Sequence, residues 1–134
     1  LIAGEPVSLL VVGDSEAAAF PRELRPYTAG RVALNGGGVR VNFLVNYGWE
    51  WDLAGLESPG QNRKAICDQL RSREVSRVDL VIRWGGMRRL SGFLPVQAVY
   101  ADFYVVDRFW PDFEPEDFQK ALAWYQKQDI TRGG

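Results

Sequence analysis

The chain has 134 residues, of which 46% are hydrophobic and 25% are charged, and its formal net charge is -1. This length and composition suit one domain with a core of its own, and the charge excludes a global field that would steer the chain to nucleic acid or to an acidic membrane. Because there is no histidine and Cys67 is the only cysteine, an internal disulfide, a Ser-His-Asp or Cys-His nucleophile and a histidine-ligated metal are also excluded.

The first half of the chain predicts two strands and little regular helix. The apolar run Val7–Val12 predicts a buried strand, and residues 17–27 are weakly helical but contain two prolines. Residues 39–46 predict a second strand, and the glycine-rich segment 35–38 is expected to be a turn. Residues 31–34 could pair with the second strand as a hairpin across that turn.

The second half alternates helices and strands. Residues 61–73 predict a helix, residues 78–83 a third strand, and residues 99–106 a fourth strand interrupted by Asp102. A last helix is expected to begin at Pro115, with apolar residues following at i, i+3, i+4 and i+7, namely Phe118, Ala121, Leu122 and Tyr125. This order predicts an α/β fold in which helices flank a mainly parallel central sheet, within one domain spanning residues 1–134.

The segment VDLVIRWGGMRRLSG, residues 78–92, predicts an anion site. Its strand ends in Arg83, and ligands of open α/β sheets collect at the carboxyl ends of strands. Glycines, here Gly85 and Gly86, let backbone N–H groups approach a ligand closely, and Arg83, Arg88 and Arg89 supply forks of donors. A phosphate-bearing substrate is the first hypothesis. A metal, if present, would be held by carboxylate and phosphate oxygens, which favours Mg²⁺.

Four blocks of this sequence match a known family in order and with plausible spacing. VGD (12–14) is similar to the family's IGD, and NFLVNYGWEWDL (42–53) is similar to NIAxNYGGRWDI. VDLVIRWGGMRRLSGFLPVQ (78–97) is similar to VDLVIRTGGExRxSNFLLWQ, and AVYADFYVVDRFWPDFEPEDF (98–118) is similar to xAYAELYFxDxxWPDFxxxDF. The chain therefore resembles the C-terminal half of the cis-prenyltransferases, the undecaprenyl and other polyprenyl diphosphate synthases.

The resemblance implies a mainly parallel central sheet wrapped by helices, usually in a homodimer. It implies condensation of isopentenyl diphosphate with an allylic diphosphate, with Mg²⁺ as cofactor and a new cis double bond in the product. Arg83, Arg89 and Ser91 match the residues that hold the pyrophosphate of isopentenyl diphosphate, with support from Gly85, Gly86 and Arg88. Asp102 matches a glutamate associated with magnesium. We expect no nucleic-acid partner and a cytoplasmic protein, since no apolar run spans a membrane and no signal peptide is recognisable, with peripheral membrane association through the product as an option.

The sequence departs from the family pattern at Trp84, Met87, Arg88 and Gly92, where the family has threonine, an acid, often histidine, and asparagine. The family's N-terminal MDGNGRW loop is not in this sequence, so upstream residues or a partner would have to supply it. Two alternatives follow: a non-catalytic accessory subunit of a heteromeric cis-prenyltransferase, and an enzyme that joins two allylic units.

Several residues keep two interpretations. Tyr47 and Trp49 could wall an apolar chain or pack under a loop, and Asp102 could pair with an arginine instead of a metal. The aromatic side chains near the last helix are expected to pack rather than contact substrate. They are Phe109, Trp110, Phe113 and Phe118.

Overall fold

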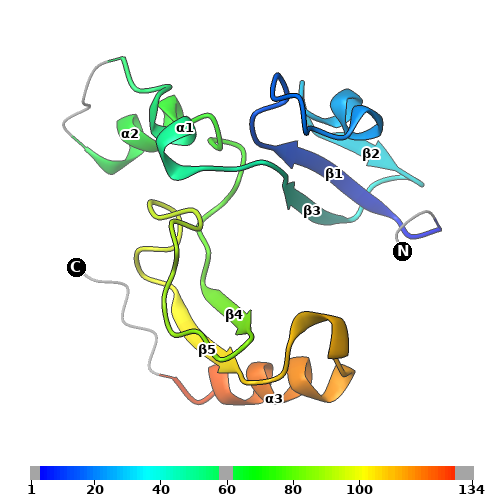
Figure 1. Ribbon diagram of the computed structural model, residues 1–134, viewed down its shortest axis with the longest axis vertical. Helices are drawn as coiled ribbons and strands as arrows, with labels where there is room; N and C mark the ends of the chain where they lie inside the picture. The colour runs from blue at the N-terminus through cyan, green and yellow to red at the C-terminus, as the bar shows by residue number, and fades with distance from the viewer. Residues whose placement is uncertain (1–3, 58–61, 129–134) are drawn as a thin grey trace. The chain divides into compact units, whose positions relative to one another are not determined.

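The computed structural model describes residues 4–57 and 62–128, and these residues form two compact units that meet in sequence between Val75 and Ser76 (Figure 1). The first unit contains β1 (Val7–Val12), the 3-10 helix η1 (Arg22–Tyr27), β2 (Val32–Leu34), β3 (Val39–Leu44), α1 (Trp49–Leu53) and α2 (Arg63–Gln69). The second contains β4 (Leu80–Trp84), β5 (Asp102–Val106), the 3-10 helix η2 (Trp110–Asp112) and α3 (Pro115–Tyr125). The expectation of a single domain over residues 1–134 stays a prediction.

Strand β1 is the centre of the first unit's sheet, whose strand order is β2-β1-β3. The predicted strand Val7–Val12 is confirmed with the same bounds. Every β1 residue except Ser8 is buried, because the strand is apolar on both faces and has a partner on both edges. β3 runs parallel to β1 from Val7↔Val39 to Val12↔Leu44, so both strands end at the same edge of the sheet.

The prediction of a hairpin between residues 31–34 and 39–46 is wrong, because these two strands do not pair with each other. β2 pairs antiparallel with β1 on one side, and β3 pairs parallel with β1 on the other. The turn between β2 and β3 therefore passes the start of β1, where a Cβ on Gly38 would lie 2.1 Å from the carbonyl oxygen of Pro6. A hairpin would have left one edge of the most buried strand without a backbone partner, which is costly inside a core.

The helices of the first unit are shorter than the sequence suggests. α2 begins after Asn62, whose side chain accepts a hydrogen bond from the Ala65 N–H at 2.9 Å, and Gln61 lies outside the described residues. The helix ends at Gln69, because Leu70 takes an extended conformation and is completely buried. The short helix α1 follows β3 and was not anticipated by the hydrophobic pattern.

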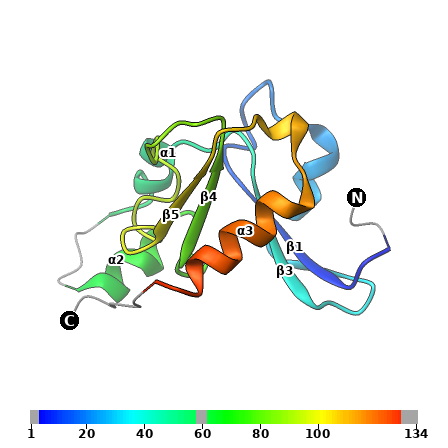
Figure 2. The same cartoon turned by 90° about the horizontal axis from the view of Figure 1, so that it is seen from below.

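In the second unit β4 and β5 pair in parallel, with Leu80 opposite Asp102. β5 begins at Asp102 and not at Val99, since Val99 and Tyr100 lie in an exposed turn. α3 begins at Pro115 as predicted and contacts both strands (Figure 2). Of its expected apolar stripe only Ala121 is buried.

The chain is confirmed as α/β, with a mixed three-stranded sheet in the first unit and a parallel two-stranded sheet in the second. A single central sheet that joins them stays a prediction. Parallel pairs still dominate, as the sequence pattern indicates. Within residues 4–57 and 62–128 no helix has the length and apolar character needed to cross a membrane.

Candidate functional site: an arginine clamp beside an apolar cavity

The loop after β4 folds back onto Arg83 and forms a compact polar cluster, which we call the arginine clamp (Arg83, Met87, Arg89 and Ser91). The Arg83 guanidinium donates to the carbonyl oxygen of Arg89 and, at 3.1 Å, to the Ser91 hydroxyl. Arg83 and Arg89 also both donate to the Met87 sulfur, at 3.7 and 3.4 Å. The structure thus brings together the three residues that the sequence predicts for a pyrophosphate.

Glycines shape this loop. Gly85, Gly86 and Gly92 all have φ between +72° and +88°, which is a conformation that residues with a Cβ rarely adopt, and Ser91 also has a positive φ of 52°. The Gly85 N–H donates to the Arg108 carbonyl at 2.9 Å, and the Gly86 N–H donates to the Val106 carbonyl at 3.1 Å. Both amide N–H groups therefore already have backbone acceptors. The two glycines support the clamp by allowing the chain to turn, and their N–H groups are not available to an anion in this conformation.

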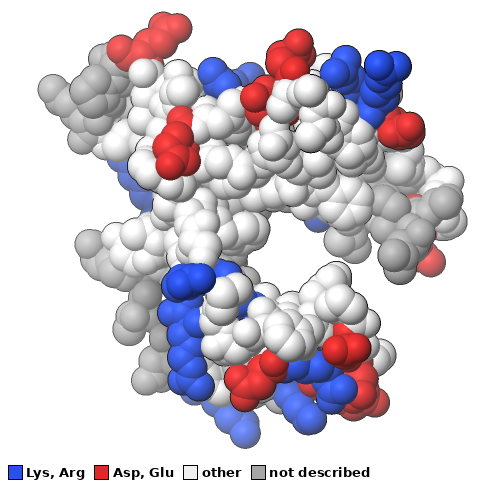
Figure 3. Space-filling model, viewed as in Figure 1, with Lys and Arg blue, Asp and Glu red and all other residues white. Residues whose placement is uncertain are grey.

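The clamp carries uncompensated positive charge. Within the described part of the chain, Arg83, Arg88 and Arg89 take part in no ion pair, and Arg88 is exposed without a hydrogen bond to any described residue. Figure 3 shows basic side chains gathered along one edge of the unit that carries β4 and β5. Because the shared acceptor, the Met87 sulfur, is neutral, it does not offset the repulsion between the two clamp guanidiniums, whereas a bound anion would.

An apolar cavity of about 230 Å³ adjoins the clamp. Val81 and Phe103 are paired across the two strands, so both side chains lie on the same face of the sheet as Arg83. The lining residues are Val81, Ile82, Arg83, Leu90, Phe93 and Phe103. Arg83 belongs to both features and places a guanidinium at the border of an apolar space. Sequence reasoning missed Leu90, Phe93 and Phe103, because their convergence depends on the strand register and the path of the loop.

Asp102 is not brought to the clamp. It opens β5 opposite Leu80, three residues before Arg83, which is about 10 Å along a strand. Alternation puts Asp102 on the face of Tyr104, whose ring lies 5.3 Å from Trp124 of α3, whereas Arg83 is on the other face. Among the described residues no three Asp, Glu, Cys or His side chains group as metal ligands, and the role of Asp102 as a magnesium ligand stays a prediction.

Tyr47 and Trp49, the candidate apolar wall, belong to the first unit. The Tyr47 hydroxyl donates to the Asp52 carboxylate at 2.8 Å, and its ring meets Trp51 edge-on at 6.3 Å. Trp49 opens α1 and is 44% exposed. Their role beside a substrate stays a prediction.

The four aromatic residues that the sequence predicts to pack lie just before α3 and in its first turn, and none of them is buried. Phe109 and Trp110 are 68% and 64% exposed, and Phe113 and Phe118 are also exposed. Trp110 and Phe113 still pack edge-on against Trp84, with ring centroids 4.9 and 5.7 Å away. These contacts form an aromatic cluster at the surface of the unit, where Trp84 stands in place of the family's threonine.

Comparison with known proteins agrees with this fold. The family profile described as "Putative undecaprenyl diphosphate synthase" matches residues 2–133. The undecaprenyl-diphosphate synthases of Blochmanniella floridana and Escherichia coli K12 are both 34% identical to the chain, over 95% and 96% of its length. A crystal structure of lavandulyl diphosphate synthase from Lavandula x intermedia, in complex with dimethylallyl diphosphate, superposes with a TM-score of 0.73 at 21% identity. That structure covers 92% of this chain.

The match is partial from the relatives' side. The chain spans 56% of the length of each bacterial relative and 58% of the lavandulyl enzyme. The match nevertheless extends over nearly all of this chain and includes the strand that ends in the arginine clamp. The chain therefore belongs to the undecaprenyl diphosphate synthase family of cis-prenyltransferases.

Proposed function

We propose that this chain binds isopentenyl diphosphate at the arginine clamp and takes part in cis-prenyl transfer to an allylic diphosphate. The observation that carries the proposal is the continuity of the clamp with the apolar cavity through Arg83. An isoprenoid diphosphate has the matching shape, a multiply charged anionic head joined to a small hydrocarbon tail. Guanidinium forks and a hydroxyl suit the head, and the cavity suits the tail.

The chemistry assigned to the clamp is binding and orientation. In the condensation, the terminal alkene carbon of isopentenyl diphosphate bonds to the first carbon of the allylic substrate, whose diphosphate leaves, and the isopentenyl unit loses a proton. The diphosphate of the isopentenyl substrate is not released and becomes the diphosphate of the product. Arg83, Arg89 and Ser91 hold this group, and the cavity around Phe103 fixes the direction of the alkene.

The allylic substrate and Mg²⁺ need groups other than those of the clamp. Asp102 as a magnesium ligand remains a proposal that requires further ligands from outside the described residues. A partner, either a second copy or a related subunit, is proposed as one source of them. The alternative of a non-catalytic accessory subunit is favoured by one observation: the clamp is built from cations, a hydroxyl and a thioether, with no carboxylate.

A chain-elongation assay separates these two functions. The purified chain is mixed with labelled isopentenyl diphosphate, farnesyl diphosphate and Mg²⁺, alone and together with a full-length family member that has been inactivated at its own isopentenyl site. Elongation by the chain alone would eliminate the accessory function. Elongation only in the mixture would place a working half-site in this chain. Absence of isopentenyl diphosphate binding in any combination would overturn the proposed binding at the clamp and leave only the accessory function.

A single substitution tests the clamp directly. Arg89→Ala removes one guanidinium but keeps the backbone carbonyl that orients Arg83. Hydrogen bonds to charged groups contribute about 1.5–3 kcal/mol, so the dissociation constant for isopentenyl diphosphate should rise about tenfold or more. The matched control is Arg88→Ala, which removes an equal charge from the adjacent position and should have the smaller effect. Equal losses in the two variants would show that only general charge attracts the ligand.

A further inference from the structure

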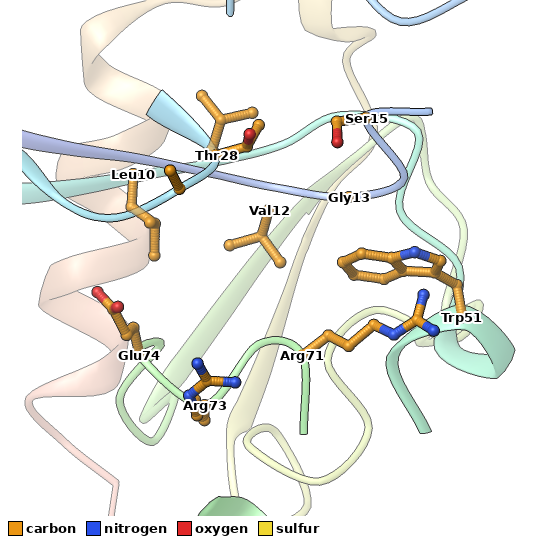
Figure 4. A pocket seen from close by; sticks show the side chains of 11 residues that line it. Leu10, Val12, Gly13, Ser15, Thr28, Trp51, Arg71, Arg73 and Glu74 are labelled. Carbon is orange, nitrogen blue, oxygen red and sulfur yellow. The ribbon is translucent and has the colours of Figure 1, made fainter. Parts of the chain in front are cut away.

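A second cavity lies wholly within the first unit, at the carboxyl end of β1 (Figure 4). Its volume is about 260 Å³. Leu10 and Val12 of β1 form an apolar wall, and Gly13 and Ser15 continue past the strand end. Trp51, Arg71 and Arg73 line it from the segments that follow β3 and α2. None of these residues belongs to the arginine clamp or to its adjoining cavity.

Arg71 and Arg73 flank Ser72, whose position is held by hydrogen bonds to Asp52. Ser72 between them is completely buried, and its N–H and hydroxyl both donate to the Asp52 carboxylate, at 2.8 and 2.6 Å. Asp52 is itself 2% exposed and also accepts from the Tyr47 hydroxyl. These bonds hold the backbone on which Arg71 and Arg73 are mounted, so less conformational freedom is lost when they bind a ligand.

Hydrogen bonds of Arg31 also connect the segment of residues 71–74 to the sheet. The Arg31 guanidinium donates to the Ser8 carbonyl at 2.9 Å and to the Asn42 side chain at 2.6 Å, and it reaches the Glu74 carbonyl at 3.5 Å. Arg31 therefore joins β1, β3 and the segment after Arg73. The cavity wall that carries the arginines is held at both ends, at Ser72 and at Glu74.

Arg71 is also ordered as a side chain. Its guanidinium lies over the Trp51 ring, 5.0 Å from the ring centroid, and the two project together at one end of the cavity (Figure 4). In residues 4–57 and 62–128, neither Arg71 nor Arg73 forms an ion pair. The Glu74 carboxylate also lines the cavity, and Figure 4 shows it on the side of Arg73, away from Trp51 and Arg71, which leaves the Trp51 end of the cavity positive.

We propose that this cavity is a second anion site, which binds a small diphosphate through Arg71 and Arg73. The parallel strands β1 and β3 end together at this edge, which is where α/β sheets bind ligands. Its volume lies just below the usual range of about 300–1,000 Å³ for ligand pockets, so the ligand is small. Leu10 and Val12 offer apolar contact to a short hydrocarbon substituent.

The test is a titration of the whole ¹⁵N-labelled chain with inorganic pyrophosphate, followed by amide NMR. We expect saturable shifts at Gly13, Ser15 and residues 71–73, separate from shifts at residues 83–92. Arg71→Gln with Arg73→Gln should abolish the first set and leave the second. The matched control, Arg22→Gln with Arg25→Gln, removes two exposed arginines of η1 in the same unit and should change neither set. The spectra also report whether each variant is folded.

The outcomes separate this site from the clamp. Shifts confined to residues 83–92 overturn the second site and leave the proposed function intact. Shifts confined to Gly13, Ser15 and residues 71–73 support the second site and overturn binding at the clamp. If no residue shows a saturable shift, both the second site and the clamp are overturned as anion sites. A parallel titration with dimethylallyl diphosphate identifies the source of the ligand. Tighter binding than inorganic pyrophosphate, by about threefold or more, assigns a diphosphate ester to the site, and equal binding assigns the free diphosphate.

Discussion

The Met87 side chain contacts the guanidinium groups of Arg83 and Arg89 and does not neutralise their charge. Its sulfur accepts from both Arg83 and Arg89, so the two cations face one acceptor that has no formal charge. A carboxylate at this position would pair with both arginines and compete with a diphosphate. We expect Met87→Glu to weaken the binding of metal-free pyrophosphate about tenfold or more, measured by calorimetry with a chelator present.

The control for this prediction is Met87→Gln, which supplies a neutral acceptor of similar length. It should bind pyrophosphate within about threefold of the parent chain. If Met87→Glu and Met87→Gln bind equally well, the charge at this position is irrelevant and the clamp is not the anion site. This single residue is therefore a sensitive probe of the whole cluster.

At this scale the charged residues of the site could be predicted from the sequence and the apolar ones could not. Arg83, Arg89 and Ser91 lie within nine residues of one another, so one loop can bring them together. Phe103 reaches the same place only because β4 and β5 pair with Val81 opposite Phe103. A shift of one residue would turn Phe103 to the other face, and nothing local determines that register.

Helix α3 starts at a position that its first turn specifies. Glu114 and Asp117 form a capping box, and the 9%-exposed Asp117 carboxylate also pairs with Arg108 at 3.1 Å. Asp117→Ala should therefore lower the free energy of unfolding by about 1–2 kcal/mol, measured by urea denaturation. Glu116→Ala removes the same charge from the same turn at an exposed position and should cost less than about 0.5 kcal/mol. Equal losses would mean that only the helix dipole matters.

The segment after α2 depends on one buried carboxylate of α1. Asp52→Ala leaves the Ser72 N–H, the Ser72 hydroxyl and the Tyr47 hydroxyl without their acceptor. We expect a loss of about 2–4 kcal/mol in the free energy of unfolding. Asp68→Ala is the control, since its pair with Lys64 is exposed on both sides and contributes about 0.5 kcal/mol or less. A small effect at Asp52 would contradict the anchoring of the segment that carries Arg71 and Arg73.

Among the elements, those encoded by a local pattern could be predicted and those decided by distant partners could not. β1 is an uninterrupted apolar run, and Pro115 marks a helix start, so both have local signals. The pairing of β2 and β3 was wrong because a glycine turn favours a hairpin, whereas β1 needs a partner on each edge. α2 ends early because burying Leu70 is worth more than continuing a helix whose last residues are polar.

At the scale of the whole molecule, a net charge of -1 conceals two local groups of arginines, at the clamp and at residues 71–73, that form no ion pair with any described residue. Binding at these groups is electrostatic, whereas the ion pairs within the fold are mostly exposed and contribute little to stability. Raising sodium chloride from about 10 mM to about 1 M shortens the Debye length from about 30 Å to about 3 Å. We expect pyrophosphate binding to weaken about tenfold or more by calorimetry, while the free energy of unfolding in urea changes by less than about 1 kcal/mol. Salt-independent binding would mean that the ligand is held mainly by apolar contacts, and a large change in stability would mean that the exposed pairs matter more than their geometry indicates.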